Sequence, residues 1–96
     1  MHKAILLLKK IPKGKVATYK ELARICNTSP RAIGRIMASN EHPKEYLCYK
    51  VVALNGELTG YSAPGGLFTK AKLLRKDGVQ LEKGKVPLRY FFKFSS

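Results

Sequence analysis

Hydrophobic side chains cluster in a short segment near the N-terminus. Four consecutive apolar residues, Ile5 to Leu8, lie in a segment that lysines flank on both sides. Pro12 and Gly14 follow, and both are residues that end helices. We therefore predict a short, buried helix over residues 3–11 and a turn into a short extended segment after it.

Two further helices are predicted between residues 18 and 39. Thr18 and Glu21 form a Thr-x-x-Glu capping box, so the first of these helices should begin at Tyr19. Ser29 is a favoured N-cap residue and Pro30 suits a first helical position, so the second should run from Pro30 to about Ser39. The positions expected to face inward are Leu22, Ala23, Cys26, Ile33, Ile36 and Met37. Two short helices joined by a short turn are typical of a helix-turn-helix.

The second half of the chain combines a hairpin pattern with a fourth helix. The sequence Asn55-Gly56 between residues 51–54 (Val-Val-Ala-Leu) and 57–59 (Glu-Leu-Thr) is typical of a β-hairpin. A helix is predicted from about Leu67 to Lys76, with Leu67, Ala71 and Leu74 on one face, and its basic positions Lys70, Lys72, Arg75 and Lys76 are expected to be solvated. The pattern predicts a mostly helical α/β fold, a winged helix-turn-helix domain with a small hairpin.

Length and charge narrow the function. The chain has 96 residues, enough for one domain, which we place at residues 1–82, with a basic and aromatic C-terminal tail at residues 83–96. Nineteen Lys and Arg residues against six Asp and Glu residues give a net charge of +13. Such an excess indicates a polyanionic partner, of which nucleic acid is the commonest. With the helix-turn-helix pattern it favours DNA binding.

Several other classes are excluded by the residues present. No apolar run is long enough to span a membrane, and no signal peptide is recognisable, so we expect a cytosolic protein with reduced cysteines. Cys26 and Cys48 lack the spacing of a metal site, and only two histidines are present, so neither a metal nor a cofactor is expected. Cys26 lies on an inward helix face and is interpreted as a structural thiol.

Five segments in a fixed order resemble one family. They are residues 18–23 (Thr-Tyr-Lys-Glu-Leu-Ala), residues 29–34 (Ser-Pro-Arg-Ala-Ile-Gly), Asn40, residues 47–52 (Leu-Cys-Tyr-Lys-Val-Val), and residues 60–62 (Gly-Tyr-Ser) with 65–67 (Gly-Gly-Leu). Together they resemble the DNA-binding, catalytic domain of the O6-alkylguanine-DNA alkyltransferases and their alkyltransferase-like relatives. The resemblance covers about residues 3–82. It does not include the N-terminal domain of the longer members, which the alkyltransferase-like branch also lacks.

The resemblance implies a function. Members of the family bind the DNA minor groove, rotate the damaged guanine out of the duplex and fill the gap with an arginine. Chemistry on a base requires this extrusion, which costs a few kcal/mol. A cysteine then takes the alkyl group irreversibly, so each molecule acts once. The implied partner is double-stranded DNA that contains O6-alkylguanine, and the protein is expected to be a monomer, in the cytoplasm, at a nucleoid or in a nucleus, or to be fused to or partnered with another repair enzyme.

The family's catalytic residues correspond to four positions of this chain. Cys48 matches the alkyl acceptor, and Asn40 matches the asparagine that braces the active-site turn. Tyr49 stands where the family has the histidine that keeps the cysteine as thiolate through a water. Asp77 falls where the family has a glutamate that supports this histidine.

The DNA-binding and base-binding positions are carried over in the same way. Arg31 matches the intercalating arginine, and Tyr19 matches the tyrosine that helps to rotate the nucleotide. The backbone carbonyls of Cys48 and Val51 would read the guanine amino group. The other positions expected to contact DNA are Ala32, Arg35 and Lys50, and Tyr61 and Ser62 are expected to close over the base.

The departures from the family concern the transfer step. Leu47-Cys48-Tyr49-Lys50 replaces Pro-Cys-His-Arg, and the loop at Ala63-Pro64 has one extra residue. A tyrosine with a pKa of about 10 is a poor proton acceptor at neutral pH. Cys48 must therefore be activated by another group, either the nearby Lys50 or a helix N-terminus. We expect transfer that is slow rather than absent.

Three functional hypotheses follow. The first is a single-turnover DNA repair protein that transfers the alkyl group to Cys48, the cysteine that the alkyltransferase-like branch replaces. The second is a non-catalytic protein that binds O6-alkylguanine and flags it for another repair pathway. The third is a winged-helix regulator that reads the major groove; Asn and Gln are absent between Pro30 and Ser39, which disfavours it.

Overall fold

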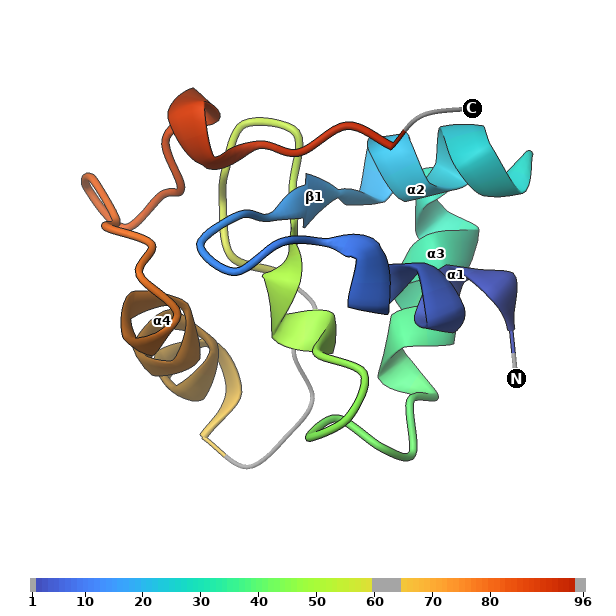
Figure 1. Ribbon diagram of the computed structural model, residues 1–96, viewed down its shortest axis with the longest axis horizontal. Coiled ribbons are helices and arrows are strands. Elements are labelled where there is room, and N and C mark those ends of the chain that lie inside the picture. The colour runs from blue at the N-terminus through green and yellow to red at the C-terminus, as the bar shows by residue number, and fades with distance from the viewer. Residues whose placement is uncertain (1, 60–64, 95–96) are drawn as a thin grey trace.

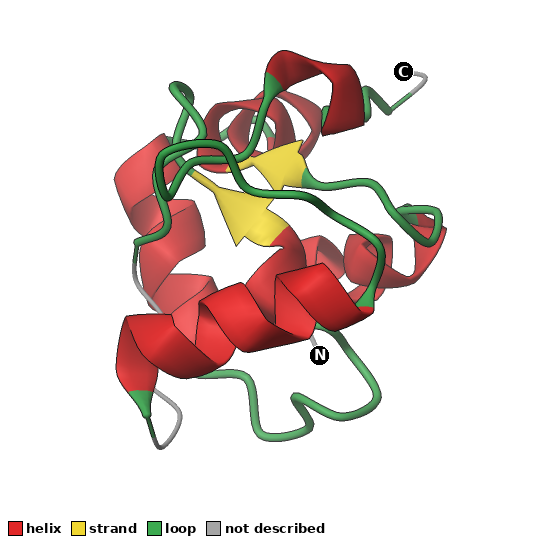
Figure 2. Cartoon of the chain, turned by 90° about the vertical axis from the view of Figure 1, so that its left-hand side faces the viewer, coloured by secondary structure: helices red, strands yellow, loops and turns green. Residues whose placement is uncertain are grey.

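The computed structural model describes residues 2–59 and 65–94. The described residues form four α-helices, three short 3-10 helices and two strands. In chain order these are α1 (Lys3–Leu7), η1 (Leu8–Lys10), β1 (Ala17–Thr18), α2 (Tyr19–Cys26), α3 (Pro30–Ala38), η2 (Cys48–Lys50), β2 (Val51–Val52), α4 (Gly66–Lys76) and η3 (Leu88–Tyr90). Helices α1, α2 and α3 pack together, α4 stands apart from them, and the strands lie between (Figures 1 and 2). No helix in the described ranges is long and apolar enough to cross a membrane.

The helix-turn-helix forms where the sequence predicts it. The Thr18 hydroxyl caps α2 by accepting a hydrogen bond from the Glu21 amide at 2.9 Å. The Ser29 hydroxyl caps α3 in the same way, accepting from the Ala32 amide at 3.1 Å. Between the helices Asn27 adopts the left-handed conformation that commonly ends a helix. The predicted helix boundaries are therefore confirmed.

The two strands pair in parallel. Ala17 lies opposite Val51 and Thr18 lies opposite Val52. Parallel strands need a crossover connection, and the helix-turn-helix is part of that connection here. The pairing places Tyr19, the residue after β1, on the same side as Ala53, the residue after β2, and both line one groove.

The expected hairpin forms only its turn. The Gly56 amide donates to the Ala53 carbonyl at 2.8 Å, and the Ala53 amide donates to the Glu57 carbonyl at 3.0 Å. Beyond this turn Glu57 pairs with Lys85 instead of continuing along β2. Gly56 has a φ of 87°, and a Cβ atom there would collide with the Val86 carbonyl, so this glycine permits the approach of the C-terminal segment.

The C-terminal aromatic segment packs along β1. The Val16 amide donates to the Tyr90 carbonyl and the Phe92 amide donates to the Val16 carbonyl, both at 2.8 Å. Figure 1 shows this segment running beside β1 towards α2. Phe94 is buried in the cluster that α1, α2 and α3 form, whereas Tyr90 and Phe91 pack against the cluster that includes Leu74 of α4.

A second hydrophobic cluster lies between the strands and α4. It contains Val16, Tyr49, Val52, Leu74, Val79 and Val86. Leu74 is fully buried as predicted, but Leu67, expected on the same face, is 48% exposed. Helix α4 therefore contacts the body through its middle and last turns rather than its first.

A buried ion pair joins η2 to the end of α4. The Lys50 ammonium lies 3.0 Å from the Asp77 carboxylate, and the two side chains are only 3% and 11% exposed. Lys50 also donates to the Pro12 carbonyl at 2.8 Å, and Asp77 accepts from the Gly14 amide at 2.9 Å. The pair thus fixes η2 against the loop after η1.

Breaking this pair is expected to destabilise the fold. Asp77→Asn leaves the Lys50 charge buried without its counter-charge, and we expect a loss of about 3 kcal/mol or more in the free energy of unfolding, measured by urea denaturation. Glu45→Gln is the matched control, because Glu45 pairs with Lys9 at 3.2 Å on the exposed surface. The control should lose far less. Similar losses in the two variants would contradict this account.

Candidate functional site

Cys48 begins η2 and is half-buried. Its amide donates to the Tyr46 carbonyl at 2.9 Å. The Asn40 side-chain amide donates to the same carbonyl at 2.7 Å, and its oxygen accepts from the His42 amide at 3.0 Å. Asn40 thus ties the end of α3 to the segment that leads into Cys48, which is an arrangement suited to bracing the turn.

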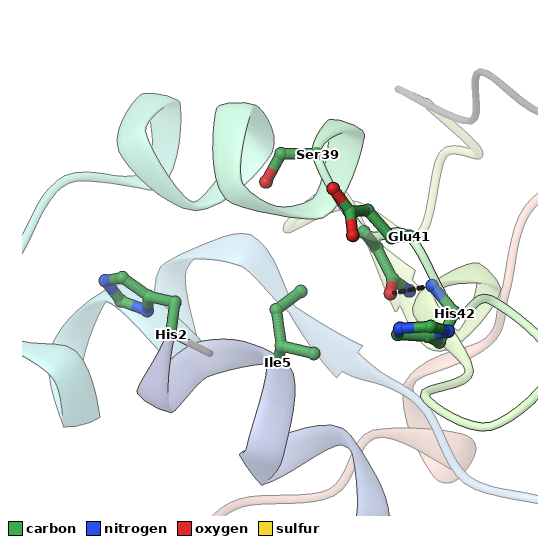
Figure 3. Close-up of a pocket in the computed structure, with 6 residues that line it drawn as sticks. His2, Ile5, Ser39, Glu41 and His42 are labelled. Carbon is green, nitrogen blue, oxygen red and sulfur yellow. Dashed lines mark hydrogen bonds between the residues drawn. The ribbon is translucent and has the colours of Figure 1, made fainter.

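A pocket of about 300 Å³ lies beside this brace (Figure 3). His2 and Ile5 lie on one side of it, and Ser39, Glu41 and His42 lie on the other. His2 Nδ1 accepts a hydrogen bond from the Ala4 amide at 3.0 Å and so caps α1. Within residues 2–59 and 65–94 no group of three His, Cys, Asp or Glu side chains is arranged to hold a metal ion.

Contrary to the prediction from the sequence pattern, Lys70 does not lie on a solvated face of α4. It is 1% exposed rather than solvated. Its ammonium donates to the Val51 carbonyl at 2.5 Å and to the Thr59 carbonyl at 2.7 Å. The same ammonium lies 5.8 Å from the centre of the Tyr19 ring, and the Tyr19 hydroxyl also donates to the Thr59 carbonyl, at 2.9 Å. Tyr19 and Lys70 therefore converge on one backbone oxygen.

Burial alters the titration of both groups. It lowers the pKa of Lys70 to about 8, while a negative charge on Cys48 acts in the opposite direction. It also raises the pKa of Tyr19, and the Cys48 charge adds to that increase.

The charge on Lys70 is unfavourable for folding. The unfolded chain holds this proton more tightly, so at neutral pH the buried ammonium lowers the free energy of unfolding by about 3 kcal/mol. The cost is complete below the folded pKa of about 8 and disappears above the reference value of 10.5. A buried charge of this kind is a candidate functional group.

A shallow groove of about 480 Å³ lies next to these residues. The starts of α2 and α3 and the turn after β2 form it. Its lining residues are Tyr19, Lys20, Pro30, Arg31, Gly34, Ala53, Leu54 and Thr59. Lys20 and Arg31 are exposed cations, whereas Pro30, Ala53 and Leu54 give it an apolar surface. Its size is typical of a small-molecule or base-sized site.

The other predicted residues of the recognition helix lie outside this groove. Arg35 is exposed on α3, one turn after Arg31, and Ala32 is half-buried with its amide bonded to Ser29. The Val51 side chain is fully buried in the core, so only its backbone carbonyl is available to a base. That carbonyl already accepts from Lys70 and has a second lone pair.

The surroundings of three residues differ from those that their predicted roles imply. Lys50, for which a DNA contact is predicted, is 2% exposed, and its ammonium is paired with Asp77. The pairing also means that Asp77 is bonded to a lysine and not to the residue after Cys48. Tyr49 is 8% exposed and packs in the cluster with Leu74 and Val79. Tyr61 and Ser62 lie outside the described residues.

Sequence reasoning missed Lys70 and Thr59. Lys70 lies one helical turn before the buried Leu74, so the period of α4 places it on the inward face. A lysine at a position where the helical period predicts a buried apolar residue could therefore have been recognised from the sequence. Thr59 takes part only through its backbone carbonyl, for which the sequence carries no signal.

Comparisons with known proteins identify the family of this chain. Residues 1–79 match the family model described as 6-O-methylguanine DNA methyltransferase, DNA binding domain. A methylated-DNA–protein-cysteine methyltransferase of Pyrobaculum aerophilum is 43% identical over 79 residues, which are 82% of this chain and 52% of that protein. The chain thus spans about half the length of this curated relative.

Two solved structures share the fold. The O6-methylguanine-DNA methyltransferase of Pyrococcus kodakaraensis strain KOD1 matches with a TM-score of 0.69 and 40% identity, over 80% of this chain and 44% of that one. S. pombe Atl1, solved in complex with damaged DNA containing O6-carboxymethylguanine, matches with a TM-score of 0.82 and 24% identity, over 95% of this chain and 92% of that one. The family match and the relatives lead to one conclusion: the chain belongs to the family of the 6-O-methylguanine DNA methyltransferase DNA-binding domain.

Proposed function

We propose that this protein binds double-stranded DNA containing O6-alkylguanine through the minor groove, rotates the damaged base out of the duplex and transfers the alkyl group to Cys48. One observation carries the proposal. Asn40 ties the end of α3 to the segment that leads into the half-buried Cys48, and Tyr19 lines the apolar groove whose exposed cations include Arg31.

Charge and shape support DNA as the partner. A net charge of +13 attracts DNA whatever its base sequence, because the attraction acts on the phosphate backbone. Arg31 stands at the start of α3, where a cation is mildly unfavourable for the helix, and an external anion relieves that repulsion. An arginine beside a base-sized apolar groove is suited to replace a base that has left the stack.

The transfer step balances without a cofactor. The Cys48 thiolate attacks the alkyl carbon, and a sulfur–carbon bond forms as the bond between that carbon and guanine O6 breaks. The electron pair of the broken bond stays on the guanine, which then takes up one proton, equivalent to the one that the thiol gave up. We propose a single turnover, in which the thioether formed on Cys48 is permanent, by a monomer in the cytoplasm or wherever the DNA lies.

A second function is favoured by one observation. Tyr49, the residue after Cys48, is packed in the core, and Asp77 is committed to Lys50. A site without an imidazole base beside the cysteine is suited to hold an extruded base without reacting. The alternative is therefore a protein that binds O6-alkylguanine and flags it for another repair enzyme, free or fused.

Intact-protein mass spectrometry separates the two functions. After incubation with a duplex carrying one O6-methylguanine, we expect a mass increase of one CH2 unit, located by peptide mapping on Cys48. Cys48→Ser should abolish the increase and keep the affinity for the duplex, whereas the matched control Cys26→Ser should react as the parent does. Tight, lesion-dependent binding without any mass change would establish the second function, and the absence of both would reject the two together.

Arg31 is expected to be needed for base extrusion. We predict that Arg31→Ala weakens binding to the damaged duplex at least about tenfold, which corresponds to about 1.4 kcal/mol. The variant should also remove the fluorescence rise of a base analogue placed opposite the lesion. Arg75→Ala is the matched control, because it removes the same charge from an exposed position of α4. Equal effects of both variants would show that Arg31 contributes only general charge.

A further inference from the structure

We propose that a second groove, between the start of α2 and the C-terminal segment at residues 90–94, holds the sugar-phosphate backbone of the DNA strand beside the extruded base. The inference rests on the proposed function, because it extends the DNA-binding surface of the same protein. The C-terminal segment lies beyond residues 1–79, which match the family model, so the family match assigns it no role.

The second groove has a volume of about 320 Å³. Figure 1 shows the C-terminal segment running towards α2, which forms the opposite wall. The lining residues are Thr18, Lys20, Glu21, Arg24, Leu54, Phe91, Phe92 and Lys93. Lys20 and Leu54 also line the groove of Tyr19 and Arg31, here called the first groove, so the two grooves meet at these two residues.

Hydrogen bonds hold the C-terminal wall in place. The Phe92 amide donates to the carbonyl of the residue before β1 at 2.8 Å. Two residues later, the Phe94 amide donates to the Glu21 carboxylate at 2.8 Å, and the Phe94 carbonyl accepts from Arg24 at 3.0 Å. The Phe94 side chain is buried in the core. Lys93 thus stands between two anchored residues, and its own side chain is exposed.

The second groove carries a net positive charge. Glu21 is its acidic lining residue, and the Glu21 carboxylate is neutralised by Arg24 at 2.7 Å. Lys20 and Lys93 are exposed, and neither belongs to an ion pair within residues 2–59 and 65–94. Two uncompensated ammonium groups on one groove attract an anionic partner.

The rest of the lining is largely apolar. Phe91 and Phe92 are half-buried, and Leu54 is 61% exposed. A DNA backbone presents two kinds of surface in alternation, the carbon atoms of deoxyribose and the charged oxygens of phosphate. Apolar side chains with lysines among them match this alternation, since the lysines contact phosphates and the apolar side chains pack on the sugars.

Continuity with the first groove identifies DNA as the occupant. Each strand of a duplex carries one phosphate about every 3.4 Å along the axis. When one base enters the first groove, the nucleotides beside it pass over the adjoining surface, and the second groove is part of that surface. An acidic protein segment would suit the same charges, but it would have to share Lys20 and Leu54 with the bound DNA.

The first test measures the affinity of Lys93→Gln for a duplex with one O6-methylguanine and for its undamaged counterpart. Lys93 lines the second groove and not the first. We expect about a fivefold loss on both duplexes, and a slope of log affinity against log salt that is shallower by about 0.9, because one phosphate contact is gone. Lys93→Arg keeps the charge and should bind as the parent does.

The matched control is Lys72→Gln, because Lys72 is an exposed lysine of α4 and its loss lowers the net charge equally. The control should stay near the parent in both affinity and salt slope. Circular dichroism checks that each variant is folded. Equal losses in Lys93→Gln and Lys72→Gln would show only general attraction and would overturn the proposal, as would a Lys93→Gln protein that binds like the parent.

A second measurement identifies the phosphate. Each phosphate beside the lesion is replaced in turn by an uncharged methylphosphonate. We expect one position on the damaged strand where the replacement weakens the parent about fivefold and leaves Lys93→Gln unchanged, because both changes remove the same contact. Losses that add up at every position would overturn the proposal.

These results are distinct from those of the transfer assay. Lesion-dependent binding with a coupled phosphate, but without a mass increase on Cys48, would reject the transfer step alone. Alkyl transfer by a Lys93→Gln protein whose DNA affinity equals that of the parent would reject the second groove alone. A protein that binds neither duplex would reject both.

Discussion

The burial of one ammonium group, that of Lys70, is the constraint on which the candidate site depends. Lys70 of α4 donates to the Val51 carbonyl in β2, and its ammonium lies 5.8 Å from the centre of the ring of Tyr19, the residue after the paired strand β1. The Thr59 carbonyl joins the same centre by accepting from both Tyr19 and Lys70. Helix, strand pair and turn are thus held together around a charge that the solvent does not reach.

The two buried lysines of this chain illustrate two uses of the same side chain. Lys50 is paired with a carboxylate, and it fixes η2 against the rest of the fold. Lys70 is bonded to neutral carbonyl oxygens, which leaves its charge uncompensated and lowers its pKa to about 8. A feature that costs folding free energy at neutral pH is more readily explained by function than by stability.

Local features of the fold could be predicted from the sequence, and long-range ones could not. The caps at Thr18 and Ser29 depend on neighbouring residues, so both helix starts were predicted correctly. Glu57, which follows the Asn55-Gly56 turn, pairs with Lys85, and Lys50 pairs with Asp77. Each partner lies about thirty residues away in sequence, and no local rule identifies it. At the site, Tyr19 and Arg31, which were singled out through the resemblance, line one groove, whereas the burial of Lys70 depends on how α4 packs against Tyr19.

The most direct test of the account is the crystal structure of the Cys48→Ser variant bound to a duplex with one O6-methylguanine. The account predicts that the guanine lies outside the base stack, next to Tyr19, with its methyl carbon about 3.5 Å from the side-chain oxygen at position 48 and Arg31 in the vacated space. A guanine that stays stacked in the duplex, or that leaves it with the methyl group directed away from position 48, would contradict it.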